Sequence, residues 1–281
     1  MGTPVLIDIG ANLAHDSFDR DRAEVIDRAV EAGVAAMIVT GSTVADSARA
    51  LALCRRWPRR LRATAGVHPH HAAGFAESEA AALAALLADP MTAAAGECGL
   101  DYFRNFSPPD EQRRAFALQL RLATEHRRPL FLHKRDAHAD FLAMLREHPG
   151  LAARAVLHCF TGGPAEAEDC LALGLSIGVT GWICDERRGH ALREAVPRIP
   201  DDRLMIETDA PYLLPRTLSP KPPHRRNEPM YLPAVLAETA RCRGQSPAAV
   251  AVQTTANACR FFGLTLEDRG GSGGTMAYEL H

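Results

Sequence analysis

The chain has 281 residues, of which 47% are hydrophobic and 23% are charged, and its formal net charge is −2. This composition is that of a folded globular protein. The near-neutral charge excludes binding to nucleic acid or to a membrane through the overall field of the molecule, so an anion site must come from local clusters. The length fits one large α/β barrel or two smaller domains.

The N-terminus and the cysteines bear on the cellular compartment. The stretch MGTPVLIDIG lacks the basic region and the long apolar run of a signal peptide. No apolar stretch approaches the ~20 residues that a bilayer-spanning helix needs. The seven cysteines are scattered without CxxC pairing, which favours reduced thiols. We therefore expect a cytoplasmic protein with no membrane segment.

Short apolar runs alternate with helical segments or long loops along the chain. The eight runs are 4–10, 35–41, 61–69, 91–99, 129–135, 155–160, 175–181 and 204–211. Amphipathic segments such as 20–33 and 108–126 lie between them. This alternation predicts an α/β fold, a (β/α)8 TIM barrel, over residues 1–265. An open doubly wound sheet would also alternate, but no GxGxxG or GxxxxGK follows the first run. The Gly-rich segment 266–281 is expected to be disordered.

Polar residues occur at or near the ends of six of the predicted strands. They are Asp8, His68, Glu97, His133, His158 and Asp209. Catalytic groups of TIM barrels lie at the C-terminal ends of the strands. A single histidine in an apolar run is usually a core residue, but several at one barrel mouth favour a site. Imidazoles combined with carboxylates match a divalent metal of a hydrolase, and Glu97, in AAGECGLD, is predicted to be a ligand.

Three further acids accompany these strand ends. Asp101 and Asp136 are expected in the loops after the fourth and fifth strands, where Asp136 could orient His133 or bind substrate. Glu207 lies two residues before Asp209 and therefore on the same side of the strand, where it could support the metal ligands.

Basic and aromatic residues also sort by their position relative to the strands. Arg127 and Arg128 precede the fifth strand and should form a solvated face at the bottom of the barrel. The basic residues that follow strands, and so surround the mouth, are Arg104, Lys134, Arg135, Arg187, Arg188, Arg216, Lys221, Arg225 and Arg226. The aromatic residues among them are Tyr102, Phe103, Phe106, Phe160, Trp182 and Tyr212. Together they favour a single-stranded nucleic acid as substrate.

Seven stretches carry a family resemblance. They are DIGANL, TAGVHPH, GECGLD, HKRDAH, VLHCFTG, GVTGWICDERRG and ETDAPYLLPR with PKPPHRRNEP. The chain resembles the TatD family of metal-dependent deoxyribonucleases over residues 5–263, and most closely the branch that gives the family its name. The resemblance implies a TIM barrel and a magnesium-dependent 3′→5′ exonuclease of single-stranded DNA or RNA, in nucleic-acid repair or turnover. It also implies Glu97, His133, His158 and Asp209 as metal ligands.

One departure concerns the first strand. Most relatives carry an H-x-H pair there, whereas this chain has Gly10 and Asn12. The TatD branch shares this loss. We expect one well-held ion, with Mg²⁺ favoured over Mn²⁺ or Zn²⁺, and a second that arrives with substrate phosphate. Asn12 is counted as a substrate-binding residue.

The predicted mechanism assigns three catalytic residues. Asp209 or Glu97 takes a proton from water, and His68 contacts the phosphate or protonates the leaving oxygen. Arg104, Arg135, Arg187, Arg225 and Arg226 are predicted to bind the substrate.

Two alternatives remain at this point. The first is a metal-dependent deacylase or amidohydrolase acting on aminoacyl-tRNA. The second is a non-catalytic barrel that binds nucleic acid or a protein. The sequence determines neither the choice between DNA and RNA nor the oligomeric state, for which a monomer is favoured.

Overall fold

Eight parallel strands form one sheet in the order β1 to β8. The computed structural model describes residues 4–266. The strands are β1 (Leu6–Ala11), β2 (Val34–Val39), β3 (Leu61–Ala65), β4 (Thr92–Asp101), β5 (Leu130–Arg135), β6 (Ala155–Leu157), β7 (Ser176–Val179) and β8 (Leu204–Ile206). A parallel bridge between Ala11 and Ala210 joins the two edges. The predicted TIM barrel is therefore confirmed.

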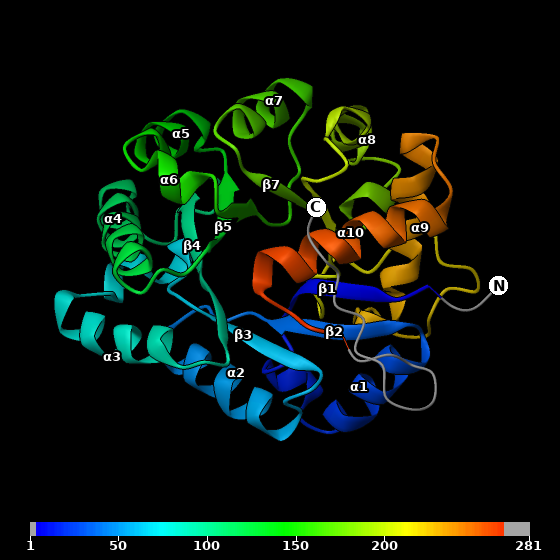
Figure 1. The fold of residues 1–281 in the computed structure, drawn as a ribbon, viewed down its shortest axis with the longest axis horizontal. Helices are drawn as coiled ribbons and strands as arrows, with labels where there is room; N and C mark the ends of the chain where they lie inside the picture. Colours follow the sequence, from blue (N-terminus) through cyan, green and yellow to red (C-terminus); the bar gives the residue numbers. More distant parts are fainter. Residues whose placement is uncertain (1–3, 267–281) are drawn as a thin grey trace.

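Helices surround this barrel, as Figure 1 shows. They are α1 (Arg22–Glu31), α2 (Val44–Arg56), α3 (Glu77–Ala88), α4 (Pro109–Glu125), α5 (His138–Arg146), α6 (Pro149–Ala152), α7 (Pro164–Ala172), α8 (His190–Ala195), α9 (Leu232–Arg243) and α10 (Pro247–Phe262). Local signals set several boundaries. The Thr43 hydroxyl accepts a hydrogen bond from the Asp46 N–H at the start of α2. Gly244 and Gly263 end α9 and α10 in the left-handed conformation.

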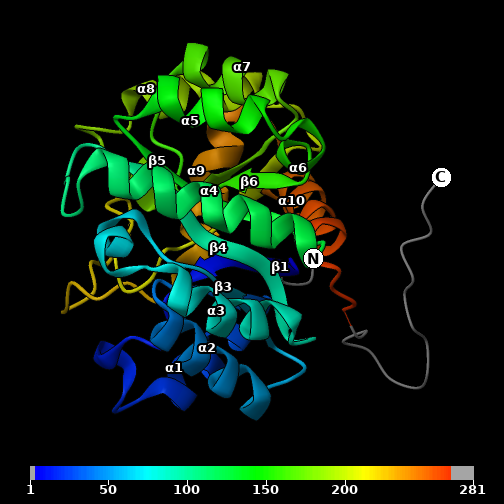
Figure 2. The ribbon, with the colours of Figure 1, turned by 90° about the vertical axis from the view of Figure 1, so that its left-hand side faces the viewer.

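The apolar core has two parts. The larger part lies between the outside of the barrel and its helices, and includes Phe116 and Phe141. The smaller part fills the inside of the barrel and includes Ile9, Phe131 and, from α10, Phe262. Helix α10 therefore closes the N-terminal end of the barrel and leaves the opposite end open for a site. Figure 2 shows α10 on one side and the yellow loop after β8 on the other.

Some predicted boundaries were wrong. Asp101 is the last residue of β4 and is buried, not a loop residue. The strands β6 and β8 have only three residues each, so His158 and Asp209 lie just beyond them. Apart from Leu266, the segment 266–281 lies outside the described residues. All seven cysteines are free. None of the helices within residues 4–266 combines the length and the hydropathy that a membrane-spanning segment needs.

Candidate active site

Glu97 occupies a bulge in β4. The pairing of β4 with β5 shifts between Ala95 and Cys98, where β4 has one residue more than β5. Gly96 and Gly99 flank the bulge at φ values of 147° and 140°, and a Cβ on either would lie about 2 Å from a carbonyl oxygen of β5. A bulge redirects side chains. The glycines of GECGLD therefore hold Glu97, which is only 7% exposed, at the barrel mouth.

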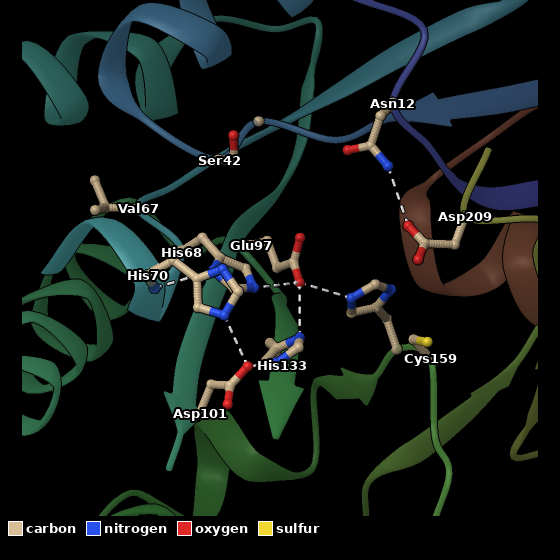
Figure 3. A network of polar contacts seen from close by, with 12 residues as sticks. Asn12, Ser42, Val67, His68, His70, Glu97, Asp101, His133, Cys159 and Asp209 are labelled. Carbon is tan, nitrogen blue, oxygen red and sulfur yellow. Dashed lines mark hydrogen bonds and ion pairs between the residues drawn. The ribbon is translucent and has the colours of Figure 1, made fainter. Parts of the chain in front are cut away.

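Three imidazoles converge on a single oxygen of Glu97 (Figure 3). Its Oε1 atom lies 2.7 Å from His158 Nε2, 3.0 Å from His133 Nδ1 and 3.3 Å from His68 Nε2. These residues come from four different strands or the segments that follow them. The structure thus brings together the predicted groups Glu97, His133, His158 and His68.

The charges of this cluster depend on one another. Burial alone would raise the pKa of Glu97, but the positive charge of His158 and hydrogen bonds from His133 and His158 hold it well below its usual value. Burial alone would lower the pKa of His158, yet Glu97 and Glu207 raise it well above the ordinary range. A buried carboxylate thus depends on a neighbouring cation, and a bound metal ion would take the place of the imidazolium proton.

His68 differs from the other two histidines in its tautomer. Its Nδ1 atom accepts a hydrogen bond from the His70 N–H at 3.1 Å. A neutral imidazole that accepts at Nδ1 carries its proton on Nε2. The Nε2 atom that faces Glu97 is then a hydrogen-bond donor and not a metal ligand. This favours contact with a phosphate oxygen over the predicted proton transfer to the leaving oxygen, because donating the last ring proton would leave an imidazolate.

Asp101 stands behind the cluster. Its Oδ2 atom lies 2.8 Å from His70 Nε2 and 3.4 Å from His133 Nε2. The expectation that Asp136 could orient His133 is wrong, because Asp136 is exposed and Asp101 occupies that position. His70 was missed as a site residue, although it is the second histidine of TAGVHPH.

Glu207 supports His158 from inside the barrel. It is fully buried, its Oε2 atom lies 3.2 Å from His158 Nδ1, and its Oε1 atom accepts from the Cys159 N–H at 2.5 Å. A Cβ on Gly10 would lie 2.2 Å from Glu207 Oε2, and one on Gly178 would lie 2.6 Å from Oε1. The space that a side chain at position 10 would need is therefore filled by the Glu207 carboxylate.

Asp209 lies across the mouth from Glu97 (Figure 3). Its Oδ1 atom accepts a hydrogen bond from Asn12 Nδ2 at 3.0 Å. Burial raises the pKa of Asp209 to about 7, while His158 opposes this rise and Glu97 adds to it. Asp8, the remaining acid at a strand end, instead joins β1 to the end of β8 by accepting from the backbone N–H and hydroxyl of Thr208.

The donor set fits a divalent cation. His68, Glu97 and His133 place nitrogen and carboxylate oxygen atoms within 4.8 Å of one another. Because Nε2 of His68 carries a proton, the ligands available to a cation are Glu97, His133 and His158, which contacts Glu97. His133 Nε2 is buried and has no hydrogen-bond partner among residues 4–266. Mixed imidazole and carboxylate ligands suit several divalent metals.

The predicted rim residues separate into several groups. Phe103, Phe106 and Tyr212 are exposed, and Arg135 stacks on Phe103 at 3.8 Å. Arg104 is exposed, and exposed Arg187 lies 3.8 Å from Glu186. Arg225 lines a pocket of about 610 Å³ together with Trp182, Arg188, Arg216 and Lys221.

Two rim expectations need correction. Phe160 is buried at 2% exposure and offers no surface for a base. Arg226 is occupied: its terminal nitrogens bond to Asp21, to Glu228 and to the Ser17 carbonyl. The structure therefore argues against Arg226 as a substrate ligand.

A TIM barrel with imidazoles and carboxylates at the ends of its strands belongs to the metal-dependent hydrolase type. The model of the TatD related DNase family matches residues 7–263. The chain belongs to this family, which confirms the resemblance seen in the sequence. The family is metal-dependent, and the cluster around Glu97 is a possible metal site.

Relatives of known name are similar over nearly the whole chain. It is 53% identical over 260 residues to the 3′-5′ ssDNA/RNA exonuclease TatD of Erwinia amylovora, covering 92% of this chain and 100% of that protein. The protein of the same name from Citrobacter rodentium is 51% identical over 262 residues, with 93% and 99% covered. The crystal structure of YJJV, a TatD homolog from Escherichia coli K12, has a TM-score of 0.84 at 28% identity, with 92% and 98% covered.

Proposed function

We propose that this protein is a metal-dependent 3′→5′ exonuclease that hydrolyses phosphodiester bonds of single-stranded DNA or RNA. The observation that carries the proposal is the convergence of three imidazoles on Glu97 Oε1 at the open end of the barrel. The relatives at about 50% identity, named 3′-5′ ssDNA/RNA exonuclease, support the substrate and the polarity.

Glu97, His133 and His158 would hold the divalent cation, with Asp209 facing it from the other side of the mouth. Mg²⁺ is favoured, and Mn²⁺ and Zn²⁺ fit the same ligands. When bound, the cation supplies Lewis acidity and positive charge at the phosphodiester. Glu207 fixes the ring of His158 through its Nδ1 atom, and the Oδ2 atom of Asp101 lies 3.4 Å from Nε2 of His133.

The chain's own groups then act on water and phosphate. Asp209 is the proposed base, since Asn12 holds one of its oxygens and leaves the other free to accept a proton from water. His68 donates its Nε2 proton in a hydrogen bond to a phosphate oxygen, which favours the charge that develops there.

The rim supplies the proposed path of the strand. Exposed Phe103, Phe106 and Tyr212 offer flat faces on which successive bases can stack. Arg104, Arg135, Arg187 and Arg225 supply positive charge for the backbone phosphates. The alternative of a non-catalytic barrel is disfavoured, because a decayed site would not retain the complete cluster of imidazoles and carboxylates.

The proposal is tested by digestion of a 5′-labelled single-stranded oligonucleotide with Mg²⁺ and with a chelator. We expect a ladder of shortening products that needs the metal and releases mononucleotides. Release of free amino acid from aminoacyl-tRNA without a ladder would establish the deacylase alternative. Tight binding without cleavage under any divalent ion would establish the binding alternative.

A cytoplasmic monomer that takes part in nucleic-acid turnover or repair completes the proposal. The cytoplasmic location is supported by the seven free cysteines, because free thiols persist in a reducing compartment.

A further inference from the structure

A second pocket lies at the closed end of the barrel. It has a volume of about 490 Å³ and is formed by residues that precede strands β5, β6 and β8, by the starts of β4 and β7, and by the end of α10. We propose that this pocket binds a small phosphorylated molecule with a flat apolar part, the chemistry of a nucleotide. The site is distinct from the barrel mouth, because α10 and the inner core separate the two ends (Figure 2).

The pocket concentrates positive charge in a molecule whose net charge is −2. Five arginines line it, namely Arg127, Arg128, Arg154, Arg203 and Arg260, against the single acid Asp202. They come from four separate segments that the fold brings together. A guanidinium group can bind two phosphate oxygens at once, so several of them around one pocket favour a phosphate-bearing ligand.

Most of this charge is not neutralised within the described part of the chain. The Nε atom of Arg203 lies 3.8 Å from Oδ2 of Asp202, and the Asp202 carboxylate is largely exposed. The other four arginines have no carboxylate within ion-pair distance among residues 4–266. Arg128 and Arg154 donate only to backbone carbonyls, and Arg260 donates to a carbonyl and to the Asn257 amide. An anion would relieve the mutual repulsion of these groups.

Backbone carbonyls hold two of the arginines, Arg128 and Arg154, in place. Arg128 donates from Nε to the Leu87 carbonyl at 2.8 Å and from one terminal nitrogen to the Asp89 carbonyl at 2.9 Å. Arg154 donates to the carbonyl of Arg127, which links two of the contributing segments. Side chains fixed in this way lose little freedom when a ligand binds, which favours affinity.

The remaining walls favour a ligand with an apolar part. The ring centroids of half-buried Phe261 and of Phe262 lie 4.7 Å apart, with the two ring planes at 70°. Met205 and Pro129 also line the pocket. A pocket of this size and mixed character is typical of small-molecule sites. Ser176, the first residue of β7, is 4% exposed and its hydroxyl forms no hydrogen bond within the described residues. It is available to a polar group of the ligand.

The test is calorimetric titration of the full chain in the presence of a chelator, with ADP and, separately, with inorganic pyrophosphate. We expect saturable binding of both, with ADP the tighter of the two because its base contacts Phe261. The double variant Arg127→Ala with Arg154→Ala should bind both at least about tenfold more weakly. Phe261→Ala should remove the advantage of ADP over pyrophosphate.

A matched control removes two arginines elsewhere. Arg114→Ala with Arg121→Ala makes the same change in charge on exposed positions of α4, and should bind as the parent does. Unchanged binding in the Arg127 and Arg154 variant, or no binding by the parent, would overturn the site. Equal affinity for ADP and pyrophosphate in the parent would overturn the nucleotide assignment. Exonuclease activity of the pocket variant should equal that of the parent.

Discussion

At the scale of single residues, His68 and His133 are distinguished by the direction of their ring protons. Both face Glu97 Oε1, but only His68 is bonded at Nδ1 by a backbone N–H. We expect His133→Ala to weaken Mn²⁺ binding about 10- to 100-fold. His68→Ala should leave Mn²⁺ affinity nearly unchanged and lower kcat about 10²- to 10³-fold. Calorimetry and single-turnover kinetics measure the two effects, and loss of Mn²⁺ binding in His68→Ala would make His68 a ligand.

Gly10 and Glu207 are sterically coupled, because the Glu207 carboxylate occupies the space beside Gly10. A Cβ at position 10 would collide with Glu207 Oε2, which is held against His158 and Cys159. We expect Gly10→Ala to lower the free energy of unfolding by about 1–3 kcal/mol, and to displace His158. In a Glu207→Ala background, Gly10→Ala should lower the free energy of unfolding by about 1 kcal/mol or less, because the carboxylate that the new Cβ would meet is absent. Equal costs in both backgrounds, measured by denaturant unfolding, would contradict the coupling.

At the scale of elements, the loop between β8 and α9 is fastened to α1. Arg226 bonds to Asp21 at 2.6 Å and to Glu228 at 2.7 Å, and Arg28 of α1 bonds to Glu228 at 2.9 Å. The Arg226 hydrogen bond is the main cause that lowers the pKa of Asp21 to about 2. This contribution to stability is therefore present above the ordinary value of 3.8 and lost as the pH falls through about 2.

Arg226→Ala should lower the free energy of unfolding at neutral pH by about 1–3 kcal/mol. It should also flatten the dependence of that free energy on pH between about 4 and 2. Arg241→Ala, which breaks an exposed pair with Glu238, is the control and should lower the free energy of unfolding much less than Arg226→Ala does, because solvent screens the exposed pair. Equal free energies of unfolding for the two variants would show that Arg226 does not stabilise the loop.

The order and type of the elements followed from the sequence, because each apolar run is a strand buried on both faces. The bulge at Glu97 did not, since a bulge depends on how β4 pairs with β5. The position of Asp101 was mistaken for the same reason: β4 extends two residues further than the apolar pattern. The role of Arg226 was also missed, because its partner Asp21 lies 205 positions away in the chain.

At the scale of the whole molecule, charge is distributed unevenly despite the net value of −2. Arg135 stacks on exposed Phe103, and Arg225 shares a pocket with three other basic residues, Arg188, Arg216 and Lys221. We expect Arg135→Ala with Arg225→Ala to weaken binding of a single-stranded oligonucleotide. The slope of log affinity against log salt should fall by about 1 for each phosphate that the variant no longer neutralises. Arg114→Ala with Arg121→Ala should leave the slope unchanged, and a parallel decrease there would show a non-specific effect of charge.

The central claim is that the Glu97 cluster holds the metal on which hydrolysis depends. The most direct test is turnover of a single-stranded oligonucleotide with Mg²⁺ by Glu97→Gln, which keeps the shape of the side chain and removes its charge. Glu168→Gln, at an exposed position of α7, is the matched control. We predict that kcat falls at least about 10³-fold in Glu97→Gln alone, with the fold retained. Parent-like turnover by Glu97→Gln would contradict the account.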